Sequence, residues 1–259
     1  MARTIPLRVL EGHARAYRHT WRGTTTSAVV TPVLFLAAMG LGLGTLVDAG
    51  SASDELGGGG YLTWLAPGLL AASTMQNAAG DGTFPVAAGM RWMKTYQAAL
   101  NTPVRPRDLL VGHLLWALLR ATLVGAVFVV VAAAFGAMPL HRGLLALLPA
   151  VLLGVGVCAA TSAFTAASDS DQALSGVFRF VIVPLFLFSG AFFPVDQLPA
   201  AVQPVVVAIP VWHGVELSRA LASGTSPALP WAVHVGVLLA LLVAGTAVAV
   251  AVFERRLRR

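Results

Sequence analysis

The sequence predicts an all-helical integral membrane protein with six transmembrane helices, and two observations support this fold class. Of the 259 residues, 57% are hydrophobic and 11% are charged, whereas soluble domains carry about 25% charged residues. Six apolar stretches are also long enough to cross a bilayer, which takes roughly 20 helical residues. They are Ser27–Val47, Tyr61–Ala79, Leu109–Phe135, Leu144–Ala167, Leu174–Phe193 and Trp231–Phe253.

The charges predict how these spans are oriented. The chain has 17 basic and 11 acidic residues, and the basic ones gather at the ends of apolar runs, which favours membrane orientation over a nucleic-acid partner. Thirteen of them fall in segments that a six-span topology with both termini inside would leave in the cytoplasm. We therefore expect a single domain over residues 1–259, with a cytoplasmic N-terminus (1–26), a six-span core (27–253) and a basic cytoplasmic tail (254–259).

The N-terminal segment is predicted to be an amphipathic helix on the inner membrane surface. Apolar residues recur at helical spacing among its arginines, at Leu7, Leu10, Ala14, Tyr17 and Trp21. A disordered basic tail is the alternative. The loop after the first span is instead acidic and glycine-rich, with Asp48, Asp54, Glu55 and the run Gly57–Gly60, and it is expected on the outer side.

The loop between spans two and three, "MRWMKTYQAALNTPVRPRD", is the basic and aromatic island of the chain. We predict a short helix over Met90–Leu100, ended by Asn101 and Pro103. One face would carry Met90, Met93, Tyr96, Gln97 and Leu100, with Arg91, Trp92 and Lys94 around it. Met, Trp, Tyr and Arg are enriched at protein interfaces, so this helix suits a docking site. An interfacial helix held by lipid headgroups is the alternative.

Two arginines lie inside predicted spans, Arg120 and Arg179. Both can reach the inner side of the membrane, so we interpret them as interfacial anchors, with contact to a substrate as the alternative.

A proline-cut segment follows span five. Pro194, Pro199, Pro204 and Pro210 divide it into pieces too short to cross, which predicts re-entrant helices that cap a path on the outer side. Within it, His213, Glu216 and Arg219 would stack on one helical face, and we favour a salt-bridged stripe over a metal site.

Catalytic groups are scarce in this sequence. A phosphate loop needs Gly directly before its Lys, but Met93 precedes Lys94, so the chain is not expected to bind ATP in that manner. No predicted span contains Asp or Glu, which argues against an ion-coupled transporter. Energy would then come from a partner that docks on the loop Met90–Asp108.

Three stretches resemble the permease subunits of ABC-2 type exporters. They are "YLTWLAPGLLAASTMQNAA", "TFPVAAGMRWMKTYQAALNTPVRPRDLLVGHLLWALLRA" and "FLFSGAFFPVDQLPAAVQPVVVAIPVWHGVELSRAL". The likeness covers about Ser27 to Phe253. It is nearest to the nodulation protein J branch of lipo-oligosaccharide exporters, with daunorubicin-resistance permeases as cousins. Such permeases often have a carboxylate just before the short cytoplasmic helix that contacts their ATPase, which is called the coupling helix. Here "DGTFPV", with Asp81, occupies that region.

The resemblance implies a function. Met90–Leu100 would be the coupling helix that enters a groove of a separate ABC ATPase subunit. That subunit would bind ATP and Mg, and the permease would bind no cofactor itself. A second copy or a homologous permease would be the membrane partner, in the bacterial cytoplasmic (inner) membrane and among its lipids. We expect export of a lipid-linked, glycolipid or drug-like substrate. A secondary multidrug transporter and a non-transporting anchor subunit are the alternatives.

Overall fold

The computed structural model describes residues 5–44 and 60–258, and every regular element in them is a helix, as predicted. The acidic loop expected at 48–59, the last residues of the first predicted span, Arg3 and Arg259 lie outside the described residues. The elements are α1 (Ile5–Ala37), η2 (Ala38–Gly44), α4 (Tyr61–Ala87), η3 (Ala88–Trp92), α5 (Thr95–Leu100), α6 (Pro106–Ala134), α7 (Leu140–Ala167), α8 (Asp171–Val177), η4 (Phe178–Ile182), α9 (Val183–Leu187), η5 (Val195–Gln197), α10 (Gln203–Ala208), α11 (Pro210–Ser223) and α12 (Trp231–Leu257).

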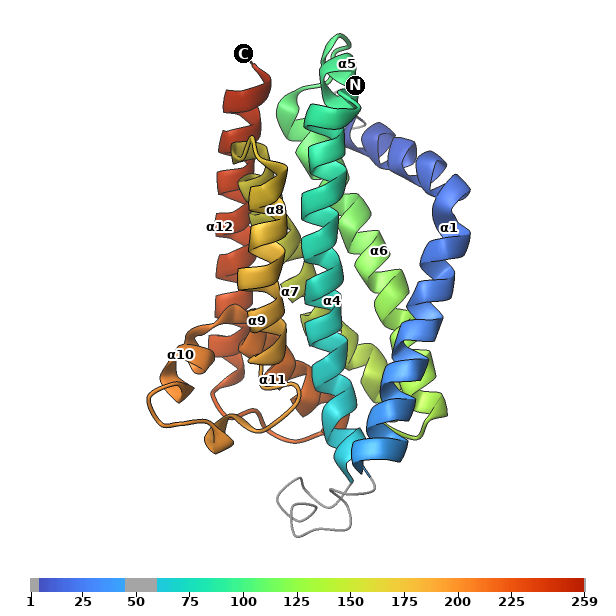
Figure 1. Cartoon of the computed structure of the whole chain (residues 1–259), viewed down its shortest axis with the longest axis vertical. Coiled ribbons are helices and arrows are strands. Elements are labelled where there is room, and N and C mark those ends of the chain that lie inside the picture. Colours follow the sequence, from blue (N-terminus) through green and yellow to red (C-terminus); the bar gives the residue numbers. More distant parts are fainter. Residues whose placement is uncertain (1–4, 45–59, 259) are drawn as a thin grey trace.

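The long helices run alongside one another, with α7 as the central helix between α4 and α12 (Figure 1). The start of α1, the short helix α5 and the end of α12 lie at one end of the bundle, which we call the coupling end. Helices α10 and α11 lie at the opposite end, which we call the cap end (Figure 1). This placement agrees with the predicted even number of crossings.

The first helix has two parts. Figure 1 shows α1 running obliquely at the coupling end and then bending to follow α6 down the bundle. In the oblique part, His13 stacks on Trp116 of α6 and Tyr17 meets the same ring edge-on. Residues 5–22 are thus helical rather than a disordered tail, and their position on the membrane surface stays a prediction.

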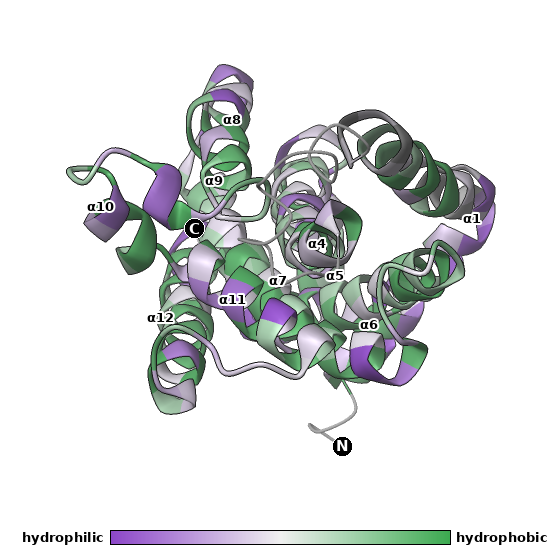
Figure 2. Ribbon diagram, turned by 90° about the horizontal axis from the view of Figure 1, so that it is seen from below, coloured by the Kyte–Doolittle hydropathy of each residue, from purple (hydrophilic) through white to green (hydrophobic). Residues whose placement is uncertain are grey.

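Among the described residues, four helical stretches are long and apolar enough to cross a membrane: Trp21–Gly40, Pro106–Ala134, Leu140–Ala167 and Trp231–Leu257. They overlap predicted spans one, three, four and six, and the first begins six residues before the predicted start at Ser27. Much of these ribbons is coloured as hydrophobic in Figure 2, and their exposed apolar side chains include Leu123 and Val130 on α6 and Val243 on α12. The apolar groups that these helices do not bury within the chain suit contact with lipid or another subunit.

The remaining two predicted spans differ from the structure in their bounds. Span five was expected at Leu174–Phe193, but the helix runs from Asp171 to Leu187 through α8, η4 and α9. Span two was expected to stop at Ala79, but α4 continues to Ala87 and carries Asp81, which is buried. The expectation that these helices contain no carboxylate is therefore wrong. The helix continues past Gly80 although Gly82 and Pro85 are poor helix formers, because this part of α4 is buried against α7, where a Cβ on Gly82 would meet Thr161 and Cys158.

The cap end is fastened by Arg219 of α11. Its Nη2 donates to the Gly190 carbonyl at 2.9 Å and its Nε to the Trp64 carbonyl at 3.3 Å. The guanidinium also lies 4.0 Å from the centroid of the Trp64 ring, a cation–π contact. The pairing of Arg219 with Glu216 in the predicted stripe is confirmed, at 3.5 Å. His213 departs from that stripe, because its Nδ1 contacts Nδ1 of His234 in α12 at 2.9 Å.

Three of the four prolines of the cap end separate short elements, as predicted, whereas Pro204 lies in the first turn of α10. Pro194 precedes η5, Pro199 follows it, and Pro210 occupies the first turn of α11, where its missing N–H costs no helical hydrogen bond. The segment therefore consists of short helices and turns, and its depth in the membrane stays a prediction.

We predict that Arg219→Lys destabilises the protein. An ammonium group cannot donate in the plane of the guanidinium to both carbonyls, so one buried acceptor loses its partner, at roughly 1–3 kcal/mol. The thermal unfolding midpoint, followed by tryptophan fluorescence in detergent, should fall. Arg179→Lys is the matched control, because Arg179 is exposed in η4. An equal decrease in both variants would contradict the prediction.

Candidate functional site

The predicted coupling helix is two pieces in the structure. The first, η3, continues α4 as a π-helix to Trp92. The chain then breaks at Lys94, whose φ of 54° is left-handed, and α5 begins at Thr95. A residue in the left-handed conformation ends a right-handed helix because its backbone dihedral angles cannot continue the helical hydrogen bonds. The conformation also costs about 1–2 kcal/mol for a residue with a Cβ. We call residues 88–104 the coupling segment.

The break divides the predicted face of the helix. Tyr96 is buried, and Met90 and Leu100 pack beside it against a cluster that includes Leu110 and Phe253. Trp92, Met93, Lys94 and Gln97 are exposed, with Met93 at 67%. The surface of this segment therefore consists of the exposed residues around the break rather than of one continuous helix face.

Arg91 fastens the coupling segment to the loop between α7 and α8. Its Nη2 lies 2.8 Å from Oδ1 of Asp171, and its Nη1 donates to the carbonyl of Ser168. The indole N–H of Trp92 donates to the other oxygen of Asp171 at 3.1 Å. Arg91, which was predicted to lie beside a docking face, is half-buried and ties the coupling segment to this loop.

The same loop is held from its other side by Arg256 of α12. The two terminal nitrogens of Arg256 lie 2.9 and 3.1 Å from the two oxygens of Asp169, which is the bidentate geometry that arginine forms with a carboxylate. Arg256 also donates to the carbonyl of Ala167. The α7–α8 loop is thereby connected to both the coupling segment and the C-terminal helix.

Tyr96 forms a second tie between the coupling segment and the bundle. Its ring lies 6.1 Å from that of Phe253, and it leaves no room beside Gly89, where a Cβ would sit 2.7 Å from two ring atoms. Burial raises the pKa of the phenol, which keeps it neutral at physiological pH. Its hydroxyl is buried without a partner in the described part of the chain.

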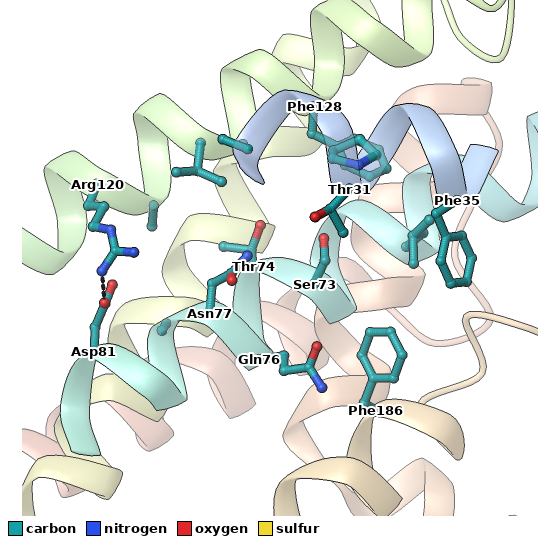
Figure 3. A pocket seen from close by; sticks show the side chains of 17 residues that line it. Thr31, Phe35, Ser73, Thr74, Gln76, Asn77, Asp81, Arg120, Phe128 and Phe186 are labelled. Carbon is teal, nitrogen blue, oxygen red and sulfur yellow. Dashed lines mark hydrogen bonds and ion pairs between the residues drawn. The ribbon is translucent and has the colours of Figure 1, made fainter. Parts of the chain in front are cut away.

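A cavity of about 330 Å³ lies deeper in the bundle, among α1, α4, α6 and α9. We call it the central pocket. Figure 3 shows its polar wall, which comes mainly from α4, and the aromatic rings of Phe35, Phe128 and Phe186 around the rest. Its polar lining residues are Thr31, Ser73, Thr74, Gln76, Asn77, Asp81 and Arg120.

Asp81 and Arg120 form an ion pair at one edge of the central pocket (Figure 3). The Asp81 side chain is 9% exposed and the Arg120 side chain 30%. His113 of α6 contacts the Asp81 backbone carbonyl at 3.0 Å, so the two helices are joined twice at this level. Arg120 was interpreted as an interfacial anchor, but its charge is directed into the bundle, toward Asp81.

Sequence reasoning missed the central pocket. The run "STMQN" in α4 was a usable signal, since it places four polar side chains in an otherwise apolar stretch. Asp81 and Arg120 were each noticed, but they are 39 residues apart, and only the packing of α4 against α6 brings them together.

Comparison with known proteins identifies relatives over most of the chain. The profile of the ABC-2 type transporter family matches residues 11–222. Nodulation protein J of Rhizobium leguminosarum bv. viciae is 32% identical over 228 residues, which cover 88% of this chain and 85% of that protein. Nodulation protein J of Rhizobium leguminosarum bv. trifolii is 33% identical, with 88% and 84% covered. The protein of the same name from Rhizobium meliloti (strain 1021) is 32% identical, with 87% and 84% covered.

We predict that Gly89→Ala loosens the coupling segment, because the added methyl group must displace the Tyr96 ring. The measurement is cleavage by endoproteinase Lys-C, for which Lys94 is the single site in this chain. Cleavage should become several-fold faster. Gly176→Ala is the control, since a Cβ there meets nothing within 4 Å. Unchanged cleavage of Gly89→Ala would show that Tyr96 does not hold the segment.

Proposed function

We propose that this chain, which belongs to the ABC-2 type transporter family, is the permease subunit of an ATP-driven exporter. It would be coupled to a separate ATPase subunit. Membership makes it a transmembrane subunit of an ABC transporter and a multi-pass membrane protein. We further propose that the coupling segment contacts the ATPase and that the chain lies in the inner membrane with both termini in the cytoplasm. It would form a dimer with a second permease.

The observation that carries the proposal is an exposed contact surface on a rigidly held segment. Trp92, Met93 and Lys94 are exposed at the coupling end, while Arg91 and Tyr96 on either side of them are tied to α8, the α7–α8 loop and α12. A partner that moves this surface would therefore move several helices together. A loosely attached loop would absorb the same displacement.

The mechanism follows from these contacts. ATP and Mg would be held by the partner, where nucleotide-driven closure would displace the coupling segment. Since η3 continues α4 without interruption, the displacement would pass along α4 toward the central pocket. Arg91 is a positioning residue in this scheme, whereas Met93 and Lys94 would touch the ATPase. The displacement of α4 would change the substrate path through the bundle from inward-facing to outward-facing.

An amphipathic lipid-linked, glycolipid or drug-like substrate fits the proposal, since the central pocket combines aromatic and polar walls. Two alternatives would behave differently. A secondary multidrug transporter would lose activity with an uncoupler while ATP persists. An anchor subunit without transport would leave substrate flux unchanged when the chain is deleted.

We predict that Met93→Ser with Lys94→Glu lowers recovery of the co-purifying ABC ATPase about tenfold, the effect of losing one good interface contact. Arg91→Gln should have a different effect. The ATPase should still bind, but transport should be lost because displacement no longer reaches the α7–α8 loop.

Arg18→Glu is the charge control for this experiment, since Arg18 is exposed on the oblique part of α1 outside the coupling segment. Membrane insertion of all variants is checked by fractionation. Undiminished ATPase recovery with Met93→Ser and Lys94→Glu would reject the coupling segment as the docking site.

A further inference from the structure

An exposed row of arginines runs along the oblique part of α1, residues 5–22. Arg8, Arg15 and Arg22 are seven residues apart, which is nearly two helical turns, so they share one side of the helix. Arg18 is exposed beside this row, and we call the four arginines the basic face. Glu11, the only acid in residues 5–22, pairs with Arg15 at 2.6 Å. Four arginines and one glutamate leave this part of the helix with a net charge of +3.

The basic face has little to neutralise it within the protein. Apart from the pair of Arg15 with Glu11, its arginines form no ion pair with a described residue. Clustered positive charges repel one another unless a counter-charge lies nearby. The basic face therefore suits a partner that brings several negative charges to one exposed surface.

A second exposed row, the apolar edge, lies next to the basic face. It consists of Leu7, Ala14 and Trp21, again seven residues apart, and Leu7 and Trp21 are 55% and 47% exposed. The guanidinium of Arg22 lies 5.9 Å from the centroid of the Trp21 ring. Adjacent apolar and basic rows are typical of a helix that lies in a lipid interface, with its apolar side among acyl chains and its arginines among headgroups.

The third side of the helix is packed against α6 and fixes how the other two are oriented. A Cβ on Gly112 of α6 would sit 2.5 Å from the Cβ of Val9, so the two backbones approach closely there. The rings of His13 and Tyr17 both contact Trp116. Burial lowers the pKa of His13, which keeps this inward side uncharged at physiological pH. The helix therefore cannot rotate to bury its arginines.

The position of the basic face along the chain favours lipid over a soluble partner. The same helix α1 continues to Ala37, and the stretch from Trp21 to Gly40 is apolar enough to cross a membrane. The arginines thus end where the membrane-crossing stretch begins, and α1 bends there (Figure 1). At that level the negative charges within reach are lipid phosphates, and only anionic lipids carry them without a compensating cation.

We propose that the basic face of α1 binds the headgroups of anionic phospholipids, with Arg8, Arg15, Arg18 and Arg22 as the contacting residues. The apolar edge would enter the acyl chains beside them. The packing of Val9 against Gly112 holds both surfaces toward the lipid. This inference goes beyond the proposed function, since it requires only that the chain lies in a membrane.

The test compares two photoactivatable lipids that differ only in their headgroup, phosphatidylglycerol and phosphatidylcholine. Each is added in a trace amount to phosphatidylcholine nanodiscs that contain the full chain, and the labelled peptides are mapped. The ratio of phosphatidylglycerol to phosphatidylcholine labelling should be about tenfold higher in residues 5–22 than in residues 231–253, which contain no Arg or Lys. Equal ratios in the two regions would overturn the proposal.

Salt provides a second readout of the same measurement. Raising the salt concentration from about 0.1 M to about 1 M shortens the Debye length from about 10 Å to about 3 Å. The excess labelling of residues 5–22 by phosphatidylglycerol should therefore decrease several-fold. An excess that does not respond to salt would contradict recognition of charge.

Two matched double variants test the residues. Arg8→Gln with Arg22→Gln should lower the labelling ratio of residues 5–22 at least fivefold, because each arginine near an anionic surface contributes to the attraction. Arg107→Gln with Arg255→Gln is the control, since it removes the same charge from exposed positions of α6 and α12 at the coupling end and should leave the ratio unchanged. An equal decrease in both double variants, or no decrease in the first, would contradict the assignment.

Gly112→Ala tests the orientation of the helix while all arginines remain. Its methyl group must push Val9 away, so the labelling ratio of residues 5–22 should fall severalfold. Gly12→Ala is the control, because a Cβ on this glycine of α1 meets nothing within 4 Å. An unchanged ratio in folded Gly112→Ala would reject the role of the packing. If that variant does not fold, the arginine variants still decide the proposal.

This proposal and the proposed function fail separately. Arg18→Glu should lower the lipid labelling ratio and leave ATPase recovery undiminished, whereas Met93→Ser with Lys94→Glu should do the reverse. Loss of ATPase recovery in Arg8→Gln with Arg22→Gln, together with an unchanged lipid ratio, would show that the basic face binds the partner protein and would reject the lipid.

Discussion

A charged side chain inside an apolar helical bundle must find an oxygen or a counter-charge within the protein, because hydrocarbon supplies neither. Arg120 and Arg219 meet this constraint, because Arg120 pairs with Asp81 in the interior and Arg219 binds carbonyls at the cap end. At the coupling end, the half-buried Arg91 and the exposed Arg256 bind the α7–α8 loop in the same way. Each contact joins segments far apart in the sequence, so each fixes how the helices are placed along one another.

The apolar contacts alone would leave that placement loosely determined. Helices rich in Ala, Leu, Val and Gly can slide or rotate against one another at little cost, since many registers bury similar surface. A buried ion pair with one acid and one arginine has a single satisfied register, and breaking it leaves an uncompensated charge. The Asp81–Arg120 pair thus specifies the register of α4 against α6. That register in turn sets which polar residues of α4 line the central pocket.

The sequence was sufficient for the fold class and for the positions of most long helices, because hydropathy and the placement of arginines depend on local composition. It was also sufficient for the proline-separated pieces of the cap end. It did not predict the break at Lys94, since a left-handed residue is held there by Tyr96 and Arg91 packing against distant helices. Nor did it predict the partner of Arg120, because α4 was expected to end two residues before Asp81. Pairings of this kind depend on tertiary packing, which a periodic pattern in one segment does not encode.

The continuity of α4 with η3 has a thermodynamic consequence. The polar wall of the pocket and the exposed residues near Lys94 belong to one uninterrupted helical rod and its end, separated by about three to five turns at 3.6 residues per turn. If both sites bias the position of that rod, linkage requires their effects to be reciprocal. A ligand that favours one position of α4 would then change the affinity of the ATPase by the same factor by which the ATPase changes the affinity for the ligand. Measuring either half of this cycle would determine the other.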